Sequence, residues 1–129
     1  MRAFLTGSEE CEWRWNLADF LLKKQIDVVD PVTSLPKHDS TFRQLKILEG
    51  CDLFIVNLCG IQRQHLLLIL EMSYASKLAK EVMIVDNIPQ RTFLTCRFPS
   101  SRSFVDLNGL KAYLNRMLLA IQAHPRMFG

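Results

Sequence analysis

The chain has 129 residues, which fits one domain with a single core. Its composition, 49% hydrophobic and 22% charged, is ordinary for a soluble globular protein, and a net charge of +3 is too small to indicate a nucleic-acid partner. No apolar run approaches the roughly 20 residues that span a bilayer, so we expect no membrane span, and we expect no signal peptide. The four cysteines form no CxxC pair, which predicts free thiols, a cytoplasmic location and no metal site.

An apolar run at residues 2–6 predicts the first strand, and a Gly-Ser pair ends it. A helix follows, with acidic residues in its first turn and an apolar repeat from Trp13 to Leu21. A second strand is predicted at residues 26–29, followed by a loop at residues 32–39. Next come a helix at residues 40–48, a strand at 53–58, a long helix at 65–78 and a strand at 82–85. A short strand at residues 103–105 and a helix at 107–123 complete the pattern.

Strands and helices therefore alternate, and the strands are continuous apolar runs of the kind found in sheets covered on both faces. This pattern predicts an α/β fold with a parallel sheet of about five strands and right-handed crossovers. Ligands of such folds bind at the carboxyl ends of the strands, near the point where the strand order reverses. Here those ends are predicted at Thr6-Gly7-Ser8, Asp30-Pro31, Asn57 to Gly60, and Asp86-Asn87.

Two titratable residues on the long predicted helix are candidates for chemistry. Glu71 interrupts an apolar run, and a carboxylate there needs a partner or a function, because an unpaired charge is costly to remove from water. Alternatively, Glu71 lies at the surface beside an Arg or Lys. His65, near the helix start, could act as a general acid or base because its reference pKa is near neutrality, or it could be an ordinary helix-start residue.

Four further positions lie at the predicted strand ends. Gly7 and Ser8 precede a helix, whose amino terminus could hold a phosphate or carboxylate, although the chain has no GxGxxG or GxxxxGK motif. A tight turn with a helix cap is the alternative. Asn57 could hydrogen-bond a sugar or a base, while Asp30 could contact a ligand or merely end its strand. Asp52 is expected at the opposite, amino end of the sheet.

Four segments together resemble the nucleoside 2-deoxyribosyltransferase superfamily, which includes the 2'-deoxynucleoside 5'-phosphate N-hydrolases. They are Ala3 to Ser8, Asp27 to Pro31, Cys51 to Leu58 and Glu71 to Ala75. The resemblance covers most of the chain and implies a flavodoxin-like three-layer sandwich that forms dimers or larger homo-oligomers. It also implies cleavage or transfer at the N-glycosidic bond of a nucleoside or nucleotide, without a cofactor. Glu71 matches the family's nucleophile, which attacks the anomeric carbon.

The same resemblance assigns substrate contacts. Phe4 and Gly7 match positions on the family's first strand, and Ser8 matches a serine that contacts the 5'-phosphate in the nucleotide hydrolases. Family members also complete each site from a neighbouring subunit, near the segment that is Thr92 to Cys96 here, and we assign Thr95 to substrate binding. Catalytic roles fall to Glu71 and His65, and the substrate-binding residues are Phe4, Gly7, Ser8, Asp30, Asn57 and Thr95.

The chain departs from the family pattern at several positions. Phe4 lacks the hydroxyl of the usual tyrosine, and His65 stands where Asp or Ser is usual. Leu66 to Leu68 replace small residues, and Glu10 falls where the phosphohydrolases have an arginine. These departures predict a site that is less adapted to phosphate. They also leave two alternatives to an N-glycosidase or transferase: a non-catalytic nucleotide-binding or interaction module, and an NAD-cleaving relative.

Overall fold

The computed structural model describes residues 1–8, 10–31, 46–59, 66–78, 80–87 and 101–123. Within these ranges one sheet contains the strands β1 (Arg2–Gly7), β2 (Asp27–Val29), β3 (Leu53–Asn57), β4 (Glu81–Val85) and β5 (Arg102–Phe104). Every neighbouring pair is parallel, and the strand order is β2-β1-β3-β4-β5. The predicted five-stranded parallel sheet is therefore confirmed.

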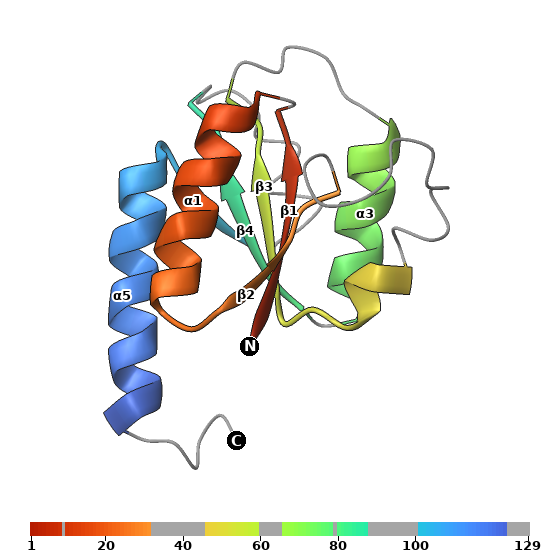
Figure 1. Ribbon diagram of the computed structural model, residues 1–129. Coiled ribbons are helices and arrows are strands. Elements are labelled where there is room, and N and C mark those ends of the chain that lie inside the picture. The colour runs from red at the N-terminus through yellow and green to blue at the C-terminus, as the bar shows by residue number, and fades with distance from the viewer. Residues whose placement is uncertain (9, 32–45, 60–65, 79, 88–100, 124–129) are drawn as a thin grey trace.

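Helices cover both faces of this sheet (Figure 1). On one side lie α1 (Cys11–Lys23) and α5 (Leu107–Ala123), and on the other side lies α3 (Leu66–Lys77). Residues 46–49 are also helical, and the rest of the helix predicted at 40–48 falls outside the described residues. The predicted three-layer flavodoxin-like sandwich is confirmed, and α5 spans the predicted residues.

The core on the α3 side begins with two stacked aromatic rings. Phe4 of β1 and Phe54 of β3 are fully buried, and their ring centroids are 5.8 Å apart. Met72 and Ala75 of α3 pack in the same cluster. Because side chains alternate along a strand, Thr6 is on the same face as Phe4, nearer the carboxyl edge. The α3 side is thus apolar in its middle and polar at that edge.

The opposite face packs against α1 and α5. Leu5, Ile55 and Met83 from the three central strands form one cluster with Leu17 of α1 and Leu110 of α5, and all five side chains are fully buried. Burial of each such side chain contributes roughly 1.5–3 kcal/mol. Since both faces are covered, every residue of β3 is buried, which explains why this strand is a continuous apolar run that ends in Asn57.

At the amino edge of the sheet, a side-chain hydrogen bond joins the starts of two strands. Asp52 Oδ2 accepts a hydrogen bond from the backbone N–H of Arg2 at 2.9 Å, so Asp52 connects the starts of β1 and β3, as expected. The thiols of Cys51 and Cys59 form no disulfide, and burial raises the pKa of the Cys51 thiol.

Across the described ranges, no helix has both the length and the apolar character needed to cross a membrane.

Candidate functional site

The candidate site lies where the strand order reverses, at the carboxyl ends of β1 and β3. Gly7 is in register with Asn57, and Ser8 N–H donates to the Asn57 carbonyl at 2.9 Å. Gly7 has φ +115°, and a Cβ atom built there would lie 2.1 Å from the Asn57 carbonyl oxygen. Only glycine fits this close approach of two backbones. Gly7 therefore has a structural reason to be glycine, independent of any ligand.

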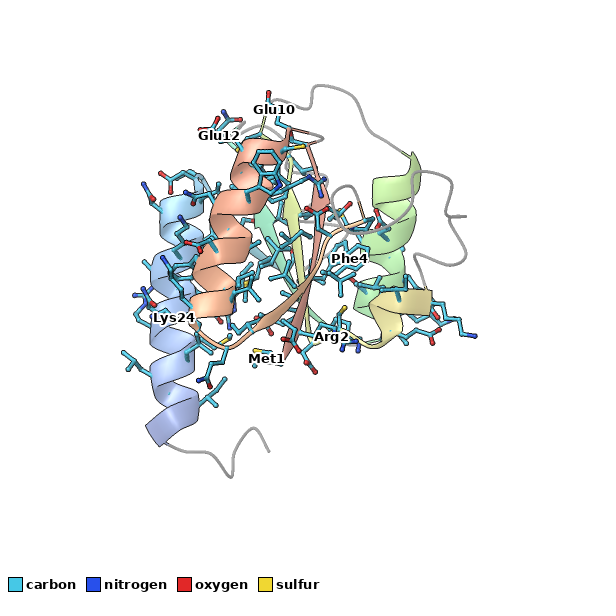
Figure 2. All side chains as sticks on the ribbon, viewed as in Figure 1. Met1, Arg2, Phe4, Glu10, Glu12 and Lys24 are labelled. Atoms are coloured by element: carbon cyan, nitrogen blue, oxygen red, sulfur yellow. The ribbon has the colours of Figure 1, made fainter. Side chains whose placement is uncertain are left out.

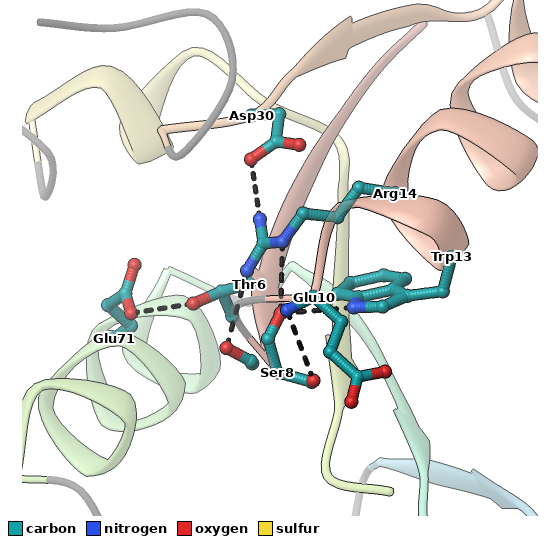
Figure 3. A network of polar contacts seen from close by, with 8 residues as sticks. Thr6, Ser8, Glu10, Trp13, Arg14, Asp30 and Glu71 are labelled. Atoms are coloured by element: carbon teal, nitrogen blue, oxygen red, sulfur yellow. Dashed lines mark hydrogen bonds and ion pairs between the residues drawn. The ribbon is translucent and has the colours of Figure 1, made fainter.

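Glu71 reaches this edge from α3. Its side chain is buried, with 1% exposure, and Thr6 Oγ1–H donates a 3.0 Å hydrogen bond to Glu71 Oε1 (Figure 3). Burial raises the pKa of Glu71 to about 7, while the Thr6 hydrogen bond and the positive charge of Arg14 act in the opposite direction. The alternative of a surface glutamate is wrong. The buried carboxylate faces the strand ends from one side of the sheet.

Arg14 reaches the same edge from α1, on the other side. Its side chain is 1% exposed, and the guanidinium Nη1 lies 2.5 Å from Asp30 Oδ1. The guanidinium also donates from Nε to the Ser8 carbonyl at 3.0 Å and from Nη2 to the Gly7 carbonyl at 3.3 Å (Figure 3). Asp30 at the end of β2 is thus engaged with Arg14, which joins β2 to the turn between β1 and α1.

Trp13 strengthens this turn. Its indole Nε1–H donates to the Ser8 carbonyl at 3.0 Å, so that carbonyl accepts from two buried side chains. The indole ring centroid is 4.8 Å from Arg14 Cζ, close enough for a cation–π contact. Sequence reasoning did not assign a role to Arg14. The signal was present, because Arg14 precedes Leu17 and Leu21 by three and seven residues and so shares their buried helix face.

The polar groups of Ser8 and Asn57 hold the local turns. Ser8 Oγ accepts from Glu10 N–H at 3.4 Å, and the Asn57 Oδ1 accepts from Cys59 N–H at 3.0 Å. Together with the bond from Ser8 N–H to Asn57, these contacts favour the interpretation of Gly7-Ser8 as a tight turn that leads into a helix. No acceptor for the Asn57 Nδ2 amide occurs among the described residues.

The structure brings five of the predicted site residues to one edge of the sheet: Gly7, Ser8, Asp30, Asn57 and Glu71. It places Phe4 elsewhere, in the core. Phe4 has 0% exposure and packs in the core next to α3 (Figure 2), so its assignment to substrate binding is not supported. His65, Thr95 and the segment Thr92 to Cys96 lie outside the described residues. Leu66 to Leu68 belong to α3, with side chains that also lie outside the description.

No group of three or more His, Cys, Asp or Glu side chains that could hold a metal ion occurs among the residues whose structure is described. Instead, the Glu71 carboxylate accepts a hydrogen bond from the Thr6 hydroxyl, and the Arg14–Asp30 ion pair lies nearby. Such an environment can adjust the protonation of a carboxyl group close to neutral pH.

No protein family model and no curated protein matches the chain. Among solved structures, it is similar to the CMP N-glycosidase BcmB of Clostridium botulinum, with a TM-score of 0.64 and 18% identity over 91% of this chain and 99% of that one. It is also similar to the receiver domain of the hybrid histidine kinase CckA, with a TM-score of 0.55 and 14% identity over 90% and 98%. The chemotaxis protein CheY4 of Vibrio cholerae gives a TM-score of 0.57 and 10% identity over the same shares. These similarities show a shared flavodoxin-like fold.

Proposed function

We propose that this protein breaks the N-glycosidic bond of a nucleoside or nucleotide, with Glu71 as the nucleophile. The observation that carries the proposal is a buried carboxylate at the strand-order reversal, where ligands of such sheets bind. The resemblance of Glu71 to Ala75 to the deoxyribosyltransferase nucleophile motif supports it. The shared fold with a CMP N-glycosidase supports the same reaction class.

In the proposed reaction, a Glu71 carboxylate oxygen forms a bond to the anomeric carbon while the bond from that carbon to the base nitrogen breaks. The electron pair of the broken bond stays on the base, which then takes up a proton. Water next attacks the anomeric carbon, its proton passes to solvent, and the ester bond to Glu71 breaks. The net reaction adds one water molecule and regenerates the carboxylate. A second base in place of water gives transfer.

The protonation of Glu71 sets the pH range of this reaction. Only the ionised carboxylate attacks, and burial raises the pKa of Glu71 to about 7. Base release is therefore expected to increase as the pH rises through about 7. Asn57 is suited to orient the sugar or base, because Cys59 N–H engages its Oδ1, while its Nδ2 has no acceptor among the described residues. The Gly7-Ser8 turn forms the neighbouring wall.

The test is to incubate the protein with a panel of nucleosides, deoxynucleotides and NAD and to measure free base by chromatography. We expect base release from at least one nucleoside or nucleotide and none from the Glu71→Gln variant, which keeps the size and the Thr6 partner of the side chain. Glu81→Gln is the matched control, because Glu81 pairs with Arg102 and lies at the amino end of β4. Full activity in Glu71→Gln refutes the proposal, as does the absence of base release from the whole panel. Base release from NAD would favour the NAD-cleaving alternative.

The second candidate is a nucleotide-binding or interaction module without catalysis. Two observations favour it: Ser8 and Arg14 use their polar groups within the protein, and the fold is shared with a receiver domain and a chemotaxis protein. Calorimetric titration with the same panel distinguishes the two candidates. Binding without base release supports the module, and binding with base release supports the glycosidase.

A further inference from the structure

Thr6 carries a buried hydroxyl on a strand that is otherwise apolar from Ala3 to Leu5. The side chain has 8% exposure, and its hydroxyl contacts Glu71 across 65 positions of sequence. A valine of nearly the same shape would fill this position on the strand without needing a hydrogen-bond partner. The specific consequence of threonine here is thus a donor directed at the Glu71 carboxylate.

The hydrogen bond distinguishes the two oxygens of that carboxylate. Thr6 donates to Oε1, and this is the one hydrogen bond that joins the Glu71 side chain to the described residues. Within the same part of the chain, Oε2 has no donor. One oxygen is therefore held at the end of β1, and the other keeps its lone pairs for another group.

We propose that Thr6 is a positioning residue for Glu71, whose hydroxyl holds Oε1 so that Oε2 is the oxygen that attacks the anomeric carbon. This inference rests on the proposed function, because it assigns a role within the same reaction. A nucleophile that is held close to the carbon it attacks, and in the right direction, reacts faster because fewer unproductive geometries compete.

The same bond favours the ionised form of Glu71, because the hydroxyl donates to the negative charge. Among the described residues, two charged side chains lie nearby: Arg14 from α1, whose charge also lowers the pKa of Glu71, and Asp30 at the end of β2, which compensates Arg14. The Arg14–Asp30 pair stays intact when only Thr6 is changed. A substitution at Thr6 therefore isolates the contribution of its hydroxyl.

The first measurement needs no substrate. The carboxyl carbon of Glu71 is followed by carbon-13 NMR against pH in the wild type, Thr6→Val and Thr6→Ser, and the Glu71→Gln spectrum assigns the signal. We expect Thr6→Val to raise the titration midpoint by roughly one to two pH units and Thr6→Ser to stay near the wild type. An unchanged midpoint in Thr6→Val overturns the inference. Thr6→Cys, whose thiol is a weak donor, serves if Thr6→Val does not fold.

The second measurement uses base release, at a pH at which Glu71 is ionised in every variant. Thr6→Val should lower kcat by roughly 10- to 100-fold with little change in KM, and Thr6→Ser should recover most of it. Equal kcat in Thr6→Val and the wild type overturns the role of Thr6 while the proposed function stands. A wild-type protein that releases no base from any substrate overturns the proposed function, and the attack by Oε2 with it.

Discussion

Arg14 Nη1 lies 2.5 Å from Asp30 Oδ1, and both side chains are almost completely buried. The same guanidinium donates to the carbonyls of Gly7 and Ser8, so this ion pair fixes the end of β2 against the turn between β1 and α1. Each charge compensates the other in a place that water does not reach. Removing one partner leaves the other buried and uncompensated, which is far more costly than the net contribution of the pair.

Asp30→Asn is therefore expected to lower the free energy of unfolding by about 3 kcal/mol, and Arg14→Met by a similar amount. The double variant should lose clearly less than the sum of the two single losses, because no unpaired charge remains. Urea denaturation at neutral pH measures all three. The matched control is Asp19→Asn, which breaks the exposed Lys23–Asp19 pair and should cost at most about 0.5 kcal/mol. Additive losses in the double variant would show that the two side chains act independently.

Gly7→Ala is expected to destabilise the protein by roughly 3 kcal/mol or more. The new Cβ would lie 2.1 Å from the Asn57 carbonyl oxygen, and the backbone has φ +115°. Gly109→Ala in α5 is the control, because a Cβ there meets its nearest atom, Asp106 Oδ1, at 3.4 Å, and alanine favours helix. Thermal unfolding of both variants makes the comparison. Equal melting temperatures would mean that β1 can move away from β3 at little cost.

Nucleosides are expected to bind at least as tightly as their 5'-monophosphates. Asp30 compensates the charge of Arg14, the guanidinium faces backbone carbonyls, and Ser8 N–H donates to Asn57. A phosphate at this turn would lack the charge-assisted bonds that contribute roughly 1.5–3 kcal/mol each, or about 10- to 150-fold in affinity. Calorimetric titration of a deoxynucleoside and its 5'-monophosphate decides the matter. A monophosphate that binds tenfold more tightly than the nucleoside would contradict this expectation and would support contact between Ser8 and the 5'-phosphate.

The sequence predicted the fold closely because its signals are local. Continuous apolar runs gave the strands, and the repeat from Leu107 to Ala123 gave the whole of α5. The apolar run around Glu71 indicated a buried carboxylate but left a surface position open, and the structure shows that the side chain is buried. The expected homo-oligomer depends on a second copy of the chain and stays a prediction, which light scattering can test.

The contacts of the site were not predictable in the same way. The partner of Glu71 is Thr6, 65 positions away, and periodicity carries no information about which strand residue a helix side chain will meet. Phe4 was assigned to the substrate by resemblance, whereas alternation on β1 directs it into the core beneath Thr6. The spacing of Arg14 to Leu17 and Leu21 indicated a buried helix face, but the partner of Arg14 depends on where Asp30 ends β2, which local spacing does not show.

Glu71 is also expected to make the stability of the protein depend on pH. Burial raises its pKa from 4.5 to about 7 in the folded state, so the folded protein binds this proton more tightly than the unfolded chain does. Protonated Glu71 therefore contributes fully to the free energy of unfolding below pH 4.5. This contribution is lost as the pH rises through about 7, a loss on the order of 3 kcal/mol. Glu71→Gln cannot ionise and still accepts a hydrogen bond from Thr6, so it should match the wild type near pH 4.5 and be more stable at pH 8.

Urea denaturation at pH 4.5 and at pH 8 tests both expectations, with Glu81→Gln as the control that should follow the wild type. If Glu71→Gln and the wild type lose stability in parallel, the carboxylate is not desolvated in solution. The expected divergence would instead mean that the fold retains a destabilising charge at the strand ends, which is the behaviour of a residue kept for chemistry.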